Sequence, residues 1–404
     1  MNPTIICTSL AVLLAIFFNV KSFAQAEAGQ DALLPPDWDP KAAADSVMVD
    51  LVNVCAPEVK GAHDSDLLIV GDKAYIIYMA NDVQPSENPR WHFVYNAMSI
   101  VDLATREVED IIPFAATERA YDNVTLPPGS CFVPRLLKID DSTLRCFFAS
   151  EAPGERESQA WYIDFNIESR TFNNQIHEAY IITTAGERLP MQPQHYYNDA
   201  VRHGFEAPQL DYGVYFIDSF KYFDDKIYAV MNNFPIGQNA LIVVEDDMKT
   251  FRILGHFNEP NEYRLSEAAI QRMPDGSWLA INRQSGGTQR YTFSKSVDGI
   301  DWTVNEYWEM IPASSSSKAT FDRFDGVYYL GWQDATEINN VHRSVFNIEI
   351  SRDGENWERK YRFETENSFQ YPVFRQHNGT IYLTATQGDH SNDRKERIMF
   401  GVLE

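Results

Sequence analysis

Four residues in the last third of this 404-residue sequence have the types and spacing to form a binding or catalytic site: Glu267, Arg283, Arg343 and Tyr371. Glu267 and Arg283 are equidistant from a turn at residue 275. In a regular hairpin they would therefore face each other on neighbouring strands. Arginine binds a carboxylate through two parallel hydrogen bonds, so the two arginines suit an acidic ligand. The simpler interpretation of Glu267 and Arg283 is a structural salt bridge.

Hairpins are the elements that would position these residues. Six times in the sequence, a tight polar turn joins two apolar segments rich in residues that favour β-strands. The turns lie near residues 72, 140, 224, 275, 325 and 378. Asp-Gly and Asn-Gly turns are strong hairpin signals, because both residues accept a positive φ. A second turn follows most of the hairpins, and in two of them Ser296–Trp302 and Ser351–Trp357 share the pattern S-x-D-G-x-x-W. There the Asp side chain can bond its own backbone and the Trp can pack back across the hairpin.

Each repeating unit thus contains four antiparallel strands in about fifty residues. We predict an all-β fold, a six-bladed β-propeller of four-stranded antiparallel blades. Residues 47–54 could supply the outer strand that the last unit lacks and close the ring. The propeller domain would span 47–404, after a loose leader over 25–46. Residues 174–212 do not repeat, and we expect an insertion there that covers one face and forms the rim of a site.

The first residues predict export. Residues 4–20 are almost wholly apolar, and Ser22 and Ala24 fit the small-x-small rule for cleavage. We expect a signal peptide over 1–24, cut after Ala24, and a secreted or periplasmic protein. An uncleaved membrane anchor is the alternative, but the span is short for a bilayer.

Composition excludes several other classes. Asp and Glu number 58 against 34 Lys and Arg, a net charge of −24, which disfavours nucleic acid and anionic membranes as partners. After loss of Cys7 an odd number of cysteines remains, so no disulfide framework is expected. Their spacing fits no zinc site. We expect no cofactor, although the acidic turns could hold a structural calcium, and we expect a monomer. The remaining cysteines should be buried, with room for one pair: Cys55, Cys131 and Cys146.

The motif order resembles the sialidase (neuraminidase) superfamily. The two S-x-D-G-x-x-W turns look like the Asp boxes, or BNR repeats, of that superfamily. A Glu at the start of a strand, an Asp-Gly turn and a strand that ends in Arg follow the sialidase order at Glu267, Asp275 and Arg283. A further Arg before the second Asp box and a Tyr at the start of the last blade match at Arg343 and Tyr371. The agreement covers residues 262–404.

The resemblance implies a glycoside hydrolase that removes an acidic terminal sugar from an anionic oligo- or polysaccharide. Tyr371 would be the nucleophile and Glu267 its base, as in sialidases. Arg283 and Arg343 would be two arms of a clamp for the substrate carboxylate. A further carboxylic acid must protonate the leaving oxygen.

Two parts of the sialidase pattern are missing. Sialidases carry a first clamp Arg in a motif like Arg-Ile-Pro, but in the comparable strand Cys131–Arg135 the Arg follows the Pro. Strand alternation would then turn Arg135 to the opposite face. Substitutes for this Arg are Arg119, Arg135 and Arg156, and the candidate acids are Glu151, Glu155, Glu157 and Asp164.

Two other functions remain open. Propeller-fold polysaccharide lyases use His and Tyr as base and acid, and the insertion contains His195, Tyr196, Tyr197 and His203. A lyase or another glycosidase acting on uronate-containing polysaccharide would use this loop, with His195 and His203 as substrate-binding residues. The third possibility is a non-catalytic glycan-binding propeller. Lys318, at the start of the fifth hairpin, could reach the central axis in any of them.

Overall fold

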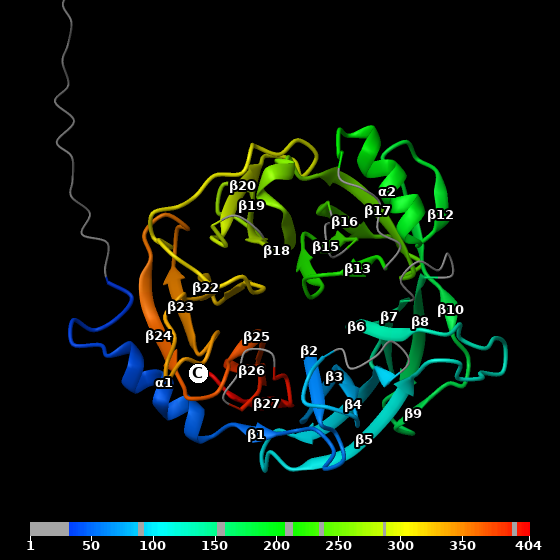
Figure 1. The fold of residues 1–404 in the computed structure, drawn as a ribbon, viewed down its shortest axis with the longest axis horizontal. Coiled ribbons are helices and arrows are strands. Elements are labelled where there is room, and N and C mark those ends of the chain that lie inside the picture. Colours follow the sequence, from blue (N-terminus) through cyan, green and yellow to red (C-terminus); the bar gives the residue numbers. More distant parts are fainter. Residues whose placement is uncertain are drawn as a thin grey trace, which may run out of the picture. The chain divides into compact units, whose positions relative to one another are not determined.

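Each strand pairs mainly with its neighbours in sequence, because tight turns join the apolar runs two by two. The computed structural model describes residues 32–87, 93–151, 158–206, 213–233, 238–285, 288–389 and 394–404. Within these residues the strands form six sheets, which follow one another around a ring in Figure 1. Residues 34–404 form one compact unit.

The first three sheets contain strands up to residue 256. The first has β2 (Gly61–Val70), β3 (Lys73–Asn81), β4 (Tyr95–Asp102) and β5 (Val108–Ala115). The second has β6 (Ser130–Lys138), β7 (Thr143–Glu151), β8 (Gln159–Asn166), β9 (Thr171–Phe172) and β10 (His177–Glu178). The third has β11 (Tyr180–Ile182), β12 (Arg188–Pro190), β13 (Tyr215–Phe216), β14 (Lys221–Phe223), β15 (Lys226–Asn232), β16 (Ala240–Val244) and β17 (Thr250–His256).

The last three sheets follow the same order. The fourth has β18 (Leu265–Arg272), β19 (Trp278–Gln284) and β20 (Thr292–Ser296), after a short 3₁₀ helix, Asn261–Tyr263. The fifth has β21 (Thr320–Phe324), β22 (Val327–Gln333), β23 (Val345–Ser351) and β24 (Glu358–Glu364). The sixth has β25 (Gln370–His377), β26 (Thr380–Gln387), β27 (Arg397–Val402) and β1 (Val52–Asn53).

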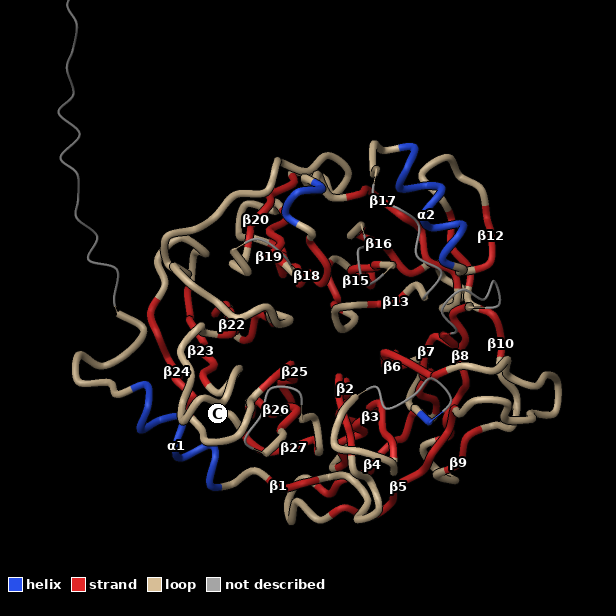
Figure 2. The backbone as a smooth tube through the Cα atoms, in the orientation of Figure 1, coloured by secondary structure: helices blue, strands red, loops and turns tan. Residues whose placement is uncertain are grey.

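The protein is therefore an all-β propeller, and strands dominate the chain in Figure 2. Five sheets have at least four strands among the described residues, whereas the fourth sheet has three. A single bridge between Phe293 and Glu306 stands where its fourth strand was expected. The core lies between neighbouring sheets, and one of its clusters joins the first sheet to the last through Tyr78 and Phe400.

The N-terminal part of the described chain differs from the expectation. Helix α1 (Pro40–Val49) replaces much of the loose leader and the start of the expected strand at 47–54. The Asp39 side chain accepts from the backbone N–H groups of Lys41 and Ala42, and Pro40 occupies the first turn. Only β1 is extended, and it pairs antiparallel with β27 through Val52 and Phe400. The predicted signal peptide over 1–24 lies outside the described residues.

The insertion also takes a different place. Its described part forms β10, β11, β12 and helix α2 (Pro193–Arg202), and β11 pairs in parallel with β17. Figure 1 shows α2 and β12 at the outer edge of the ring. The reason is burial: Ile181, Met191 and Tyr196 pack into the core of the third sheet. Among the described residues of the insertion, β11, β12 and α2 thus extend the third sheet outward and β10 adds to the second sheet, and none of them covers the centre.

Cys55, Cys131 and Cys146 are free thiols and buried, and no pair forms among them. None of the described helices is long and apolar enough to cross a membrane.

Candidate functional site

The hairpin of β18 and β19 brings Glu267 and Arg283 together. The register shifts between Leu265 and Ala268, so Glu267 lies in a β-bulge at the start of β18. The Nη1 atom of Arg283 donates a hydrogen bond to Glu267 Oε2 across the two strands. Both side chains are mostly removed from solvent, Arg283 being 12% and Glu267 8% exposed.

Tyr371 reaches this pair from the last sheet. A second bulge interrupts β25 between Gln370 and Val373, and Tyr371 there has φ of 53°. Its hydroxyl donates to Glu267 Oε2 at 2.9 Å and accepts from Arg283 Nη1 at 2.7 Å. Burial raises the pKa of Tyr371 well above its ordinary value, Arg283 lowers it, and Glu267 raises it. A neutral phenol therefore sits between a carboxylate and a guanidinium.

Arg343 lies beside these residues but has no acidic partner. Its Nη1 donates to Gln370 Oε1 at 2.8 Å and its Nη2 donates to the Ser316 carbonyl. Ser316 Oγ also accepts from Arg283 Nε at 2.8 Å, which ties the two arginines to one residue. Arg343 Nε is shielded from solvent and has no hydrogen bond. Burial and the charge of Arg283 lower the pKa of Arg343. Among the described residues, Arg343 thus makes no direct hydrogen bond or ion pair with a carboxylate, although the charges of Glu87 and Glu267 act on it from beyond ion-pair distance.

Glu267, Arg283, Arg343 and Tyr371 form the Tyr371 cluster. Three residues that the sequence did not single out complete it: His63, Glu87 and Lys395. The His63 ring meets the Tyr371 ring edge-on, with centroids 4.3 Å apart. His63 Nε2 lies 3.2 Å from Glu87 Oε2, and Lys395 Nζ donates to Glu87. Burial raises the pKa of Glu87, but the charge and hydrogen bond of Lys395 lower it, and the net pKa shift is downward. Burial, followed by the charge of Lys395, lowers the pKa of His63 and keeps it neutral.

A signal for His63 was present in the sequence. His63 stands at the start of β2, at a distance before its hairpin turn similar to that of Glu267 and Tyr371 before theirs. The first strand of its sheet has the same kind of bulge, between His63 and Asp66. Comparison of the hairpins by position, without regard to residue type, would have found it.

Arg135 is buried and already forms an ion pair with Asp64. Its Nη2 is 3.1 Å from both carboxylate oxygens of Asp64 and donates to the Ile217 carbonyl at 2.9 Å. Lys318 Nζ binds the same Asp64 at 2.6 Å and lies 4.9 Å from the Tyr371 ring centroid. Burial raises the pKa of Asp64, but Arg135 and Lys318 bring it down to about 2. Asp64 thus joins Arg135 to Lys318, which lies against the Tyr371 ring, and Arg135 is 1% exposed with its charge balanced by Asp64.

The histidines of the insertion lie elsewhere. His195, on α2, has Nδ1 2.9 Å from the Pro190 carbonyl. His203, the residue that caps α2, contacts Thr184 Oγ1 at 2.8 Å and packs against His256. The structure does not bring either residue to Tyr371.

The remaining candidates divide into three groups. Arg119 donates to the Pro113 carbonyl, and Asp164 pairs with Arg145, so both are engaged away from the cluster. Glu151 ends β7, is buried, and interacts with Tyr215 and with the charge of Glu87. Burial raises the pKa of Glu151 to about 8. Three candidates lie outside the described residues: Glu155, Arg156 and Glu157.

Comparison with known proteins gives matches of structure only. No protein-family model and no curated protein matches the chain. A protein of unknown function from Dyadobacter fermentans matches 88% of this chain and 97% of its own, with 13% identity and a TM-score of 0.60.

Sialidases are among the other similar structures. Trypanosoma rangeli sialidase in complex with sialic acid matches 88% of this chain with 10% identity and a TM-score of 0.57. A Hadza microbial sialidase matches 85% with 13% identity and a TM-score of 0.57. This chain spans 57% and 65% of the length of those two proteins. At these identities the likeness concerns the fold, and the chain therefore has a β-propeller of the kind found in sialidases.

Proposed function

We propose that the protein is an exported, sialidase-like exo-glycoside hydrolase that removes an acidic terminal sugar, sialic acid or a relative of it, from glycans. The observation that carries this proposal is the position of the Tyr371 hydroxyl, which bonds both Glu267 and Arg283. Arg343, a cation without an acidic partner, lies next to them. The fold shared with sialidases adds support. The protein would act as a monomer, after removal of the signal peptide.

The two arginines would bind the carboxylate of the substrate. A guanidinium that is shielded from water and bonds no carboxylate favours an anionic ligand, since the ligand supplies the direct charged partner that the protein does not. Arg343 bonds no carboxylate directly, whereas Arg283 is partly neutralised by Glu267. Arg343 would therefore contribute more of the binding energy. The protein's net charge of −24 does not oppose this, because a local cluster can dominate the field in a cleft.

Tyr371 and Glu267 would perform the substitution. The Tyr371 oxygen attacks the anomeric carbon while its proton passes to Glu267 Oε2, which is already 2.9 Å away. The glycosidic bond breaks and the leaving oxygen takes a proton from a carboxylic acid. Water, deprotonated by that acid's conjugate base, then displaces Tyr371, which recovers its proton from Glu267. A neutral phenol approaches a carboxylate-bearing carbon with less repulsion than a carboxylate nucleophile would.

Two carboxyl groups are candidates for the general acid. Glu87 is close to the reacting groups through His63, but Lys395 lowers its pKa. Glu151 holds its proton at neutral pH because its pKa is about 8. A general acid must be protonated when the substrate is bound. The pH profiles of Glu87→Gln and Glu151→Gln separate the two, since only loss of the acid removes the alkaline limb of kcat.

A lyase acting on uronate-containing polysaccharide is the second candidate. The edge-on contact between His63 and Tyr371 favours it, because these residue types suit the base and acid of β-elimination. The histidines of the insertion would then have no part in it, since His195 and His203 bond Pro190 and Thr184.

Turnover of fluorogenic sugars tests the first proposal. The panel comprises a sialoside, a glucuronide, a galactoside and a rhamnoside, beside uronate polysaccharides followed by ultraviolet absorbance of an unsaturated product. Sialoside cleavage should fall about thousandfold or more in Tyr371→Phe and in Glu267→Ala. Tyr222→Phe is the matched control, because Tyr222 is exposed and lies outside the cluster. Absorbance without sialoside cleavage would support the lyase, and silence on every substrate would leave a glycan-binding propeller.

A further inference from the structure

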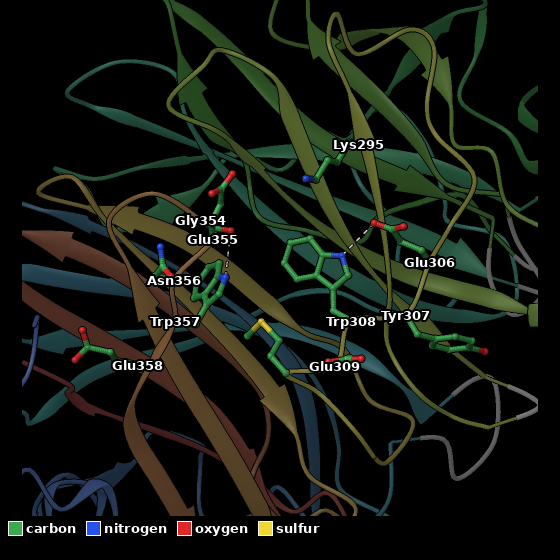
Figure 3. Close-up of a pocket in the computed structure, with 11 residues that line it drawn as sticks. Lys295, Glu306, Tyr307, Trp308, Glu309, Gly354, Glu355, Asn356, Trp357 and Glu358 are labelled. Atoms are coloured by element: carbon green, nitrogen blue, oxygen red, sulfur yellow. Dashed lines mark hydrogen bonds between the residues drawn. The ribbon is translucent and has the colours of Figure 1, made fainter. Parts of the chain in front are cut away.

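A groove separates the fourth and fifth sheets on a part of the molecule that the proposed reaction does not use. Its volume is about 640 Å³, within the usual range of ligand pockets, roughly 300–1,000 Å³. Two stretches of chain line it, residues 306–310 and 354–358, together with Lys295. Figure 3 shows Trp308 and Trp357, one from each stretch, on the two sides of the groove. None of the residues of the Tyr371 cluster lines it.

The two indoles are held in place before any ligand arrives. Trp308 stacks on Phe293 with centroids 3.9 Å apart and planes 6° apart, and its N–H donates to Glu306 Oε1 at 3.3 Å. The Trp357 N–H donates to the Gly354 carbonyl at 3.1 Å. Both indole N–H groups are satisfied within the protein and Phe293 covers one face of Trp308, so the remaining ring surface at the groove is apolar. A rigid aromatic loses little conformational entropy when it binds a partner.

The charges of the groove restrict the ligand. Four glutamates and one lysine line it, an excess of three negative charges: Glu306, Glu309, Glu355, Glu358 and Lys295. Acidic sugars and other anions are therefore repelled, in contrast to the arginine cluster at Tyr371. A cation finds competition, since Lys295 Nζ lies 5.7 Å from the Trp308 ring centroid. Carboxylates accept hydrogen bonds from hydroxyl groups, so an uncharged, hydroxyl-rich ligand suits both the rings and the acids.

We infer that this groove is a second, non-catalytic site that binds neutral oligosaccharides. The C–H groups on one face of a pyranose ring pack against the electron-rich face of an indole, and the hydroxyls at its edge donate to Glu309 and Glu355. The site holds an uncharged stretch of glycan on the outside of the propeller. This inference does not depend on the reaction at Tyr371, so either can fail without the other.

Titration of the full chain labelled with ¹⁵N-tryptophan tests the site. The neutral probes are galactotetraose, mannotetraose and an N-acetyllactosamine tetrasaccharide; tetragalacturonate is the anionic probe, and choline and spermidine are cationic. At least one neutral probe should shift the indole N–H resonances of Trp308 and Trp357 at micromolar to millimolar concentration. Tetragalacturonate should not. The same shifts should appear in Arg343→Met, which removes an arginine that the proposed function uses to bind ligand at the central cluster.

Variants assign the binding to the groove. Trp308→Ala should weaken it about tenfold or more by calorimetry, and Trp308→Phe should restore most of it. Because Trp308→Ala also removes a contact with Phe293, the double variant Glu309→Gln and Glu355→Gln provides an independent test, with a loss of several-fold. Tyr222→Ala, at an exposed tyrosine outside the groove, should bind normally. Absence of any neutral binding at millimolar concentration, binding that these variants leave unchanged, or binding of cations alone would overturn the inference.

Discussion

Arg283 and Arg343 are neighbouring arginines with opposite electrostatic surroundings. Arg283 bonds the carboxylate of Glu267, whereas Arg343 bonds only neutral oxygens from Gln370 and Ser316. Loss of one partner of a shielded ion pair leaves the other charge uncompensated, while loss of an unpaired cation relieves repulsion. The stability of the free protein should therefore respond differently to the two arginines.

We predict that Arg283→Met lowers the free energy of unfolding by about 3 kcal/mol and that Arg343→Met changes it by no more than about 1 kcal/mol. Urea unfolding without ligand measures both. An anionic inhibitor should stabilise the wild type but not Arg343→Met, because the variant lacks the unpaired cation. Equal destabilisation by both substitutions would contradict this account of Arg343.

Glu151 predicts a pH dependence of stability. Burial raises the pKa of its carboxyl to about 8 in the folded protein, and Glu87 adds to the rise while Tyr215 opposes it. An unfolded Glu has a pKa of about 4.3, so between these values the folded state binds the proton more tightly. This stabilisation is complete below about pH 4 and is lost as the pH rises through about 8.

Glu151→Gln should therefore flatten the decline of the unfolding free energy between about pH 5 and pH 8, by the order of a few kcal/mol. Urea unfolding at a series of pH values measures the slope. The control is Glu118→Gln, at an exposed glutamate in a turn, which should leave the slope as it is. A wild-type slope in Glu151→Gln would show that this carboxyl is ionised in the folded protein.

At the scale of single residues, the contact between Glu267 and Arg283 was predictable because one turn sets the register of one hairpin. Their contact with Tyr371 was not derivable in this way, since Tyr371 belongs to another sheet; only the sialidase-like motif order suggested it. His63, Glu87 and Lys395 were missed for the same reason. Their positions depend on how the first and last sheets pack against each other, and local sequence patterns do not predict the packing between sheets.

Among the elements, the bulges in the innermost strands decide which side chains point to the cluster. Bulges occur in β2, β6, β18 and β25. In three of these strands the bulge includes a residue with positive φ: Asp64, Val133 and Tyr371. Strand alternation, applied to Arg135, assumed a regular strand and ignored this extra residue. The Val-Pro and Tyr-Pro dipeptides at residues 133–134 and 371–372 were the available signal, because Pro inside a strand marks an edge or a bulge.

The turn around Asp353 offers a test of stability at this scale. Its Oδ1 accepts from the backbone N–H groups of Glu355 and Asn356, both at 2.8 Å. Asp298 makes the equivalent bonds to Ile300 and Asp301, at 2.8 and 3.2 Å. Neither carboxylate contacts the Tyr371 cluster.

Asp353→Ala and Asp298→Ala should each lower the unfolding free energy by about 1–2 kcal/mol, because backbone donors lose their acceptor. Both variants should retain kcat/KM on any substrate that the wild type turns over. Unfolding and initial-rate measurements on the same preparations provide the comparison. A variant that keeps its stability but loses activity would assign these turns a role in the reaction.

At the scale of the whole molecule, the ring brings together residues that are far apart in the chain. His63 from the first sheet meets Tyr371 from the last, and Glu267 comes from the fourth. The repeated hairpins made the propeller predictable, since each unit depends on local turns. Helix α1 and the outward position of the insertion differ from the sequence prediction. Asp39 and Pro40 form a helix start signal for α1, and the buried face of α2 packs into the core instead of forming a site rim.

If Tyr371 is the nucleophile, it forms a covalent bond with an acidic sugar, and mass spectrometry after incubation with 2,3-difluorosialic acid should detect that bond. Fluorine at the sugar's third carbon slows hydrolysis of a glycosyl-enzyme, so an intermediate should accumulate. We expect a mass increase on the peptide that contains Tyr371, absent in Tyr371→Phe and slower to form in Arg343→Met. An unmodified protein, or a label on any other residue, would contradict the assignment of Tyr371 as the nucleophile.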